Sequence, residues 1–217
     1  MRYVVLDSKG RHKGQRAFVL GTGPSLLVTQ GLSRLQQEVV FVCSRMKLWT
    51  GLPFVPTYQV ITEPLHVQEI HRWEMEGVRE RFLVSNGFLD RKGWSWIPKE
   101  PQEHYLVQDG VRGLEESWMP LTNGRSSVLA AVQIALWMGA DPIYLAGCET
   151  TFKGHAWDPE DVRPRGHGVD ARVVDAFRVA HAGMRNKGRS LVDCTPSGYL
   201  SRQGVLPYEA LEEVLGV

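Results

Sequence analysis

This sequence of 217 residues has few cysteines and almost no net charge. The three cysteines, Cys43, Cys148 and Cys194, lie far apart, form no C-x-x-C pair and are odd in number. This pattern argues against a disulfide framework and a cysteine-based zinc site, and it predicts three unpaired thiols of the kind that the cytoplasm keeps reduced. With 25 Lys+Arg against 24 Asp+Glu the net charge is +1, so the composition gives no reason to expect a surface for polyanions.

Long hydrophobic runs are also missing. No stretch approaches the ~18 consecutive apolar residues of a membrane-spanning helix, and residues 1–7 are interrupted by charge too early to form a signal peptide. Hydrophobic residues make up 43% and charged residues 23% of the chain, as in ordinary globular proteins. We therefore expect one soluble, cytoplasmic domain over residues 1–217.

Short apolar runs alternate with amphipathic stretches along the chain. We expect strands at residues 17–20, 38–43, 58–61, 81–85, 104–107, 142–147 and 191–194. Helices are expected from Pro24 through the leucines up to residue 35, and over residues 126–139, 170–186 and 208–215. This alternation predicts an α/β fold, namely a single Rossmann-like domain with a mostly parallel central sheet and helices on both faces.

A Gly-Thr-Gly-Pro-Ser segment at residues 21–25 follows the first expected strand and opens the first expected helix. Its glycines let the backbone approach a phosphate, and the free N–H groups of a helix start favour negative charge. The segment is not G-x-G-x-x-G, because Leu26 takes the third glycine position, and it is not a P-loop, because no Gly-Lys-Ser/Thr follows. It is either a phosphate-binding turn or a tight connection without a ligand.

A second segment of this kind precedes the helix expected over residues 126–139. Residues 122–125 offer a glycine turn, a hydroxyl group, backbone N–H donors and the Arg125 cation. The alternative is an ordinary N-cap, since Thr122 or Ser126 could satisfy the first N–H groups of the helix. Two such helix starts in one α/β domain favour a nucleotide monophosphate or diphosphate as the ligand.

Glu149 follows the strand expected over residues 142–147, so its carboxylate should lie at the carboxyl edge of the sheet. It could hold a ribose, a Mg²⁺ ion or an acceptor hydroxyl, or it could be only a solvated acid or the partner of a helix start. The loop at 148–169 contains His155 and His167, and a histidine there could act as a general base near neutral pH. The spacing of these two histidines matches no known ligand pattern, so no metal site is predicted.

Seven segments together resemble a known superfamily. They are FVLGTGPSL at 18–26, VVFVCS at 39–44, TNG at 122–124, IYLAG at 143–147, KGHAWD at 153–158, GH at 166–167 and VDCTPSG at 192–198. In this order they resemble the small bacterial CMP-sialic-acid-dependent sialyltransferases. They equally resemble the related domain of archaeal 6-hydroxymethylpterin diphosphokinases and flagellin-modifying nonulosonate transferases. The match covers nearly the whole chain and is weakest over residues 65–115.

The resemblance implies a role for each matching position. It places around the nucleotide the matching residues Gly21, Thr22, Gly23, Pro24, Ser25, Asn123 and Gly124. Ser44 and Glu149 stand at further nucleotide-site positions of the family, and the Arg125 cation beside Gly124 completes the expected nucleotide site. His167 falls where the sialyltransferases have their catalytic base, and His155 lies where a group could donate to the leaving phosphate.

The sequence also departs from the sialyltransferase pattern. Ser44 and residues 62–64 replace asparagine positions that contact the donor, and Phe152 and His155 replace tyrosines that support the leaving phosphate. Glu149 stands where both branches have an aspartate, which in the diphosphokinase branch helps to bind Mg²⁺.

Three functions fit these observations. The first is a glycosyltransferase that uses a nucleotide sugar such as a CMP-sugar and needs no cofactor. The second is a Mg²⁺-dependent diphosphotransferase, and the third is a catalytically silent nucleotide-binding module. The acceptor stays open between a glycan, a protein and a modified nucleic acid, and a homo-oligomer is compatible with the sequence.

Overall fold

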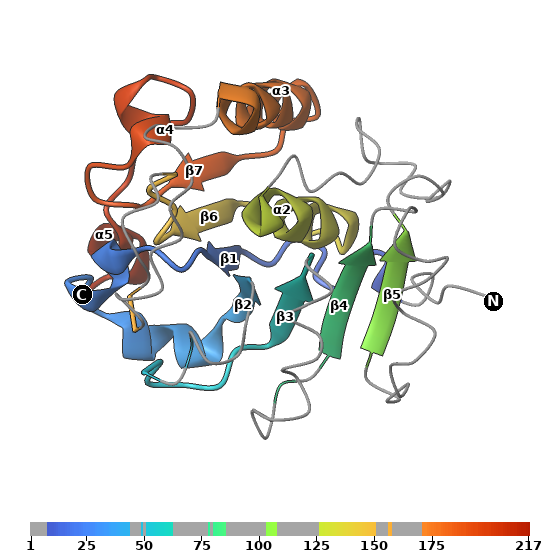
Figure 1. Ribbon diagram of the computed structural model, residues 1–217, viewed down its shortest axis with the longest axis horizontal. Helices are drawn as coiled ribbons and strands as arrows, with labels where there is room; N and C mark the ends of the chain where they lie inside the picture. The colour runs from blue at the N-terminus through green and yellow to red at the C-terminus, as the bar shows by residue number, and fades with distance from the viewer. Residues whose placement is uncertain are drawn as a thin grey trace.

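The computed structural model describes residues 8–43, 49, 51–62, 78, 80–85, 103–107, 126–150, 156–157 and 171–217. It contains a sheet of seven strands, all parallel, in the order β5-β4-β3-β2-β1-β6-β7 (Figure 1). The strands are β1 (Ala17–Leu20), β2 (Val39–Cys43), β3 (Tyr58–Ile61), β4 (Glu80–Ser85), β5 (Glu103–Val107), β6 (Ile143–Ala146) and β7 (Leu191–Asp193). The seven expected strands and the parallel α/β fold are confirmed, while the extent of the domain over residues 1–217 stays a prediction.

The first strand lies inside the sheet rather than at its edge. From β1 the chain adds β2, β3, β4 and β5 on one side, and then returns to add β6 and β7 on the other. The order therefore reverses between β1 and β6, and open α/β sheets bind their ligands at the carboxyl ends of the strands beside such a reversal.

Alternate side chains of the strands point into two separate cores. One core lies against α2 (Ser127–Trp137) and α3 (Ala171–Asn186), and the other against the short helices η2 (Pro24–Leu27), η3 (Leu32–Gln37) and α5 (Leu211–Leu215). In β1, Ala17 and Val19 face the first core, whereas Phe18 and Leu20 face the second. Helices thus cover both faces of the sheet (Figure 1), as expected.

The helix α2 runs antiparallel to the strands and is buried along nearly its whole length. Its first residue, Ser127, shares a hydrogen bond of 2.6 Å between hydroxyl groups with Thr62, just after β3. Near its other end, the carbonyl of Met138 accepts the N–H of His12, before β1. The N-terminus of α2 therefore lies at the carboxyl edge of the sheet.

Two helix expectations are wrong. The helix expected from Pro24 is instead two 3-10 helices, η2 and η3, because Gly31 between them adopts a left-handed conformation with φ of +76°. The last helix begins at Leu211 rather than Tyr208, because Tyr208 forms a bridge with Asp193 that extends the edge of the sheet. A four-residue helix, α4 (Tyr199–Arg202), was not expected.

The expectation of three unpaired thiols is confirmed, since Cys43, Cys148 and Cys194 are all free and buried. Among the residues that the structure describes, no helix combines the length and the apolar character needed to cross a bilayer.

Candidate functional site

The segments that follow β1 and β6 are joined at the reversal point of the sheet. The N–H of Gly21 donates to the carbonyl of Ala146 over 2.8 Å, and the N–H of Gly23 donates to the carbonyl of Gly147 over 2.9 Å. These bonds continue the pairing of β1 with β6 beyond the strands themselves. The turn at 21–25 and residues 147–149 therefore form one unit.

Both glycines of the turn are required by close packing against residues 147–149, which follow β6. A Cβ atom on Gly21 would overlap the carbonyl oxygen of Gly147 and lie 2.9 Å from the Cys148 sulfur. A Cβ atom on Gly23 would overlap the carboxylate of Glu149. The G-x-G pattern is thus explained by the contact with residues 147–149, which follow β6, and the approach of a phosphate to the turn stays a prediction.

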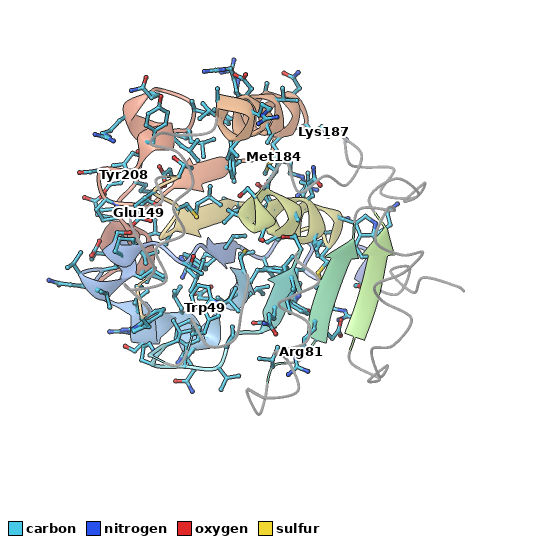
Figure 2. All side chains as sticks on the ribbon, viewed as in Figure 1. Trp49, Arg81, Glu149, Met184, Lys187 and Tyr208 are labelled. Atoms are coloured by element: carbon cyan, nitrogen blue, oxygen red, sulfur yellow. The ribbon has the colours of Figure 1, made fainter. Side chains whose placement is uncertain are left out.

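The Glu149 carboxylate reaches directly into the turn. Its Oε1 atom accepts the backbone N–H of Ser25 over 2.6 Å, and Figure 2 shows Glu149 at the end of the sheet where β6 stops. Its Oε2 atom and the Ser25 hydroxyl oxygen are both buried and have no hydrogen-bond partner among the residues that the structure describes. Of the roles considered for Glu149, the structure shows that of partner to a helix start.

A second connection reaches the turn from the segment after Glu149. The N–H of Ala156 donates to the carbonyl of Thr22 over 2.9 Å, and the Trp157 ring lies so close to Gly51 that a Cβ atom there would overlap it. The Trp157 ring also contacts that of Trp49, with 5.8 Å between the ring centroids. The segments after β1, β2 and β6 therefore meet at one edge.

Trp49 is the buried centre of this contact. It is fully buried, and its indole N–H donates to the carbonyl of Cys43 over 2.9 Å. Sequence reasoning gave neither Trp49 nor Trp157 a role at this edge. The available signal was the presence of Trp157 two residues after His155 in the KGHAWD segment.

The start of α2 contributes to the same edge. Ser126 occupies the N-cap position, but its side chain makes no capping hydrogen bond. Because α2 has 11 residues, its free N–H groups and its dipole favour an anion at this end. Of the two side chains considered as alternative caps, Ser126 therefore makes no capping bond, and Thr122 lies outside the described residues.

A buried acid, Asp193 at the end of β7, orders the segment that follows this strand. Asp193 is fully buried and accepts the N–H of Thr195 over 2.9 Å and that of Ser201 over 3.2 Å. Burial raises the pKa of the Asp193 carboxyl, and the hydrogen bonds from Thr195 and Ser201 partly offset this. The Thr195 hydroxyl in turn accepts the N–H of Cys148 over 3.0 Å, which connects this segment to the end of β6. An aspartate inside an apolar strand was the sequence signal for this role.

The three thiols are not nucleophiles at neutral pH. Burial raises the pKa values of Cys43 and Cys148 well above the ordinary value, and that of Cys194 to about 12. Nearby acids such as Asp193 raise the pKa values of Cys148 and Cys194 further. A thiolate, which is the reactive form, is therefore suppressed at all three positions.

The structure brings six of the expected site residues together, namely Gly21, Thr22, Gly23, Pro24, Ser25 and Glu149. The other six, His155, His167, Ser44, Asn123, Gly124 and Arg125, lie outside the described residues. Three of their sequence neighbours, Cys43, Ser126 and Ala156, are described and lie at the carboxyl edge. The described residues contain no group of three or more His, Cys, Asp or Glu side chains that could hold a metal ion.

No protein-family model and no curated protein matches this sequence. Solved structures share its fold. The sialyltransferase CstII from Campylobacter jejuni, in complex with cytidine-5'-monophosphate, aligns with a TM-score of 0.54 at 15% identity, over 90% of this chain and 85% of that one. A second structure, sialyltransferase CST-II with a trisaccharide acceptor and CMP, aligns with a TM-score of 0.54 at 14% identity, over 87% and 84% of the two chains. At this identity the similarity shows a sialyltransferase-like fold.

Proposed function

We propose that this protein is a glycosyltransferase that uses a nucleotide sugar, with a CMP-linked sugar as its donor. The observation that carries the proposal is the joining of the segments after β1 and β6 at the reversal point of the sheet. Parallel α/β domains bind their ligands at this point. The fold is shared along most of the chain with a sialyltransferase that binds CMP, which supports the choice of donor.

In this proposal the donor phosphate binds at the carboxyl edge, between the turn at 21–25 and the N-terminus of α2. Ser44, Asn123 and Gly124 contact the nucleotide, and Arg125 neutralises the phosphate charge that develops as the sugar leaves. His167 removes the proton of the acceptor hydroxyl as that oxygen bonds to the anomeric carbon, and the CMP leaves with the bonding electron pair. His155 donates a hydrogen bond to the leaving phosphate. The acceptor is a glycan, and no cofactor is required.

A Mg²⁺-dependent diphosphotransferase is the second candidate, and one observation favours it. The buried Glu149 Oε2 atom and the Ser25 hydroxyl oxygen find no hydrogen-bond partner in the described ranges, and carboxylate and hydroxyl oxygens are the ligand types that Mg²⁺ binds. Here Mg²⁺ would neutralise the charge of a transferred diphosphate. Chelation with EDTA separates the two candidates, because it would abolish diphosphate transfer and leave glycosyl transfer largely intact.

A thermal-shift screen tests the proposed donor. CMP, CDP, UDP, GDP, ATP and AMP are compared, each with and without Mg²⁺, and we expect the cytidine nucleotides to give the largest shift without Mg²⁺. A ligand at 100 times its Kd stabilises the folded state by about 2.7 kcal/mol, which raises the Tm of a protein of this size by roughly 5–10 °C. A shift with ATP that requires Mg²⁺ would instead favour the diphosphotransferase, and no shift with any nucleotide would refute the proposal.

A further inference from the structure

The turn at 21–25 already holds a carboxylate group of the protein itself. The Glu149 carboxylate accepts the Ser25 N–H over 2.6 Å and packs against the Cα of Gly23. These are the groups that the proposed function assigns to the donor phosphate. The Glu149 carboxylate and the phosphate of the donor would therefore occupy the same position.

Two observations indicate that this arrangement is incomplete. The second carboxylate oxygen of Glu149 and the hydroxyl oxygen of Ser25 are both buried, and within the described part of the chain neither has a hydrogen-bond partner. Buried polar atoms are normally paired, so two unpaired ones at the same place are unusual. Because η2 has only four residues, its dipole contributes little here, and the contact and the buried atoms distinguish this turn.

We propose that Glu149 is a tethered competitor of the donor, so that an anionic ligand binds to the turn only by displacing the Glu149 carboxylate. This inference rests on the proposed function and assigns Glu149 a new role within it. When the carboxylate leaves, the Ser25 N–H and the Ser25 hydroxyl both become available as donors to the phosphate. Glu149 thereby lowers the affinity for nucleotide, because one N–H cannot serve both anions and the two charges repel each other.

The test compares CMP binding by calorimetry, with and without Mg²⁺, to the wild type and to Glu149→Gln and Glu149→Ala. Glu149→Gln removes the charge and keeps the shape, whereas Glu149→Ala removes the competing acceptor altogether. A hydrogen bond to a charged group is worth a factor of about 10–100 in an equilibrium constant. We therefore expect CMP to bind about tenfold more tightly to Glu149→Gln and about 10–100-fold more tightly to Glu149→Ala.

Glu212→Gln is the matched control. The Glu212 carboxylate also accepts a backbone N–H, that of Gln30, over 3.0 Å, and Glu212 is half-buried, as Glu149 is. It belongs to α5 and lies outside the joined segments after β1 and β6. Its substitution changes the net charge by the same amount, and CMP affinity should stay as in the wild type.

The outcomes separate this inference from the proposed function. If the wild type binds CMP and the Glu149 variants bind it equally or more weakly, Glu149 is not a competitor, and the proposed function stands. Weaker binding only when Mg²⁺ is present would make Glu149 a metal ligand, which also overturns the inference. If no variant binds CMP, both ideas fail. Tighter binding by Glu149→Gln, even where wild-type binding is undetectable, supports both.

A measurement on the unsubstituted protein covers the case in which a variant does not fold. The amide proton of Ser25, bonded to a carboxylate, should have a strongly downfield NMR shift that changes when CMP saturates the protein. An unchanged Ser25 resonance at saturation would show that Glu149 has stayed in place, and would overturn the inference.

Discussion

Gly23→Ala is the substitution that probes the joined unit most directly. Gly23 has φ of −70° and ψ of 151°, an extended conformation that alanine adopts without strain. The added Cβ atom would overlap the Glu149 carboxylate and come within 2.6 Å of the carbonyl oxygen of Gly147. Any cost of the substitution therefore comes from these two contacts and not from the backbone conformation.

The expected magnitude follows from the two contacts. Moving the Glu149 carboxylate away breaks its bond to Ser25, and a hydrogen bond to a charged group contributes about 1.5–3 kcal/mol. Crowding against Gly147, which cannot withdraw easily because it accepts the Gly23 N–H, adds the roughly 1–3 kcal/mol typical of overpacking. We expect the free energy of unfolding to fall by about 3–5 kcal/mol and the Tm by roughly 6–20 °C.

A double-mutant cycle with Glu149→Ala, measured by urea denaturation, isolates the carboxylate contact. In the Glu149→Ala background only the crowding against Gly147 remains, so Gly23→Ala should cost about 1.5–3 kcal/mol less than in the wild type. Gly188→Ala is the control, since Gly188 has φ of +67° and open space around it. That control should cost about 1–2 kcal/mol from its backbone conformation and show no coupling to Glu149. A coupling energy between Gly23 and Glu149 below about 0.5 kcal/mol would refute the reasoning.

Three further predictions concern thiols, pH and catalysis. All three thiols are buried and have raised pKa values, so a thiol reagent at pH 8 should label none of them rapidly in the folded protein. After denaturation the reagent should label all three, and fast labelling of the folded protein would contradict this prediction. Because the pKa of Asp193 is raised in the folded protein, the folded state keeps this proton to higher pH than the unfolded chain does. The protonated group therefore stabilises the folded state fully below its ordinary pKa of 3.8, and this stabilisation is lost as the pH rises through the folded-state pKa. The stability of the wild type relative to Asp193→Asn should therefore fall with rising pH, and a difference that is constant with pH would show the assignment to be wrong. Loss of a general base lowers turnover by about 10²–10⁴, so His167→Ala should reduce glycosyl transfer by this factor with little change in CMP affinity, whereas wild-type turnover would exclude His167 as the base.

The strands could be predicted because the residue types in each strand reflect how far that strand is buried. Strands of a parallel sheet that helices cover on both faces are buried on both sides, so they are continuous apolar runs, as in Val39–Cys43 and Ile143–Ala146. The helix α2 could be predicted for the same reason. The predictions of elements with weaker patterns were wrong. The leucines between residues 26 and 35 fit one amphipathic helix, but the chain turns at Gly31.

The sequence by itself also located the candidate site, because G-x-G after one strand and Glu149 after another both point to the carboxyl edge of a parallel sheet. Only the tertiary structure decided how these parts meet. The neighbouring positions of β1 and β6 depend on the order of strands in the sheet, which local patterns do not encode. The contact between Ser25 and Glu149 joins residues that are 124 positions apart, and it forms because pairing of β1 with β6 brings their ends within reach of one side chain. The glycines that the sequence associated with a phosphate therefore pack, in the folded chain, against the segment after β6 and against a carboxylate of the protein itself.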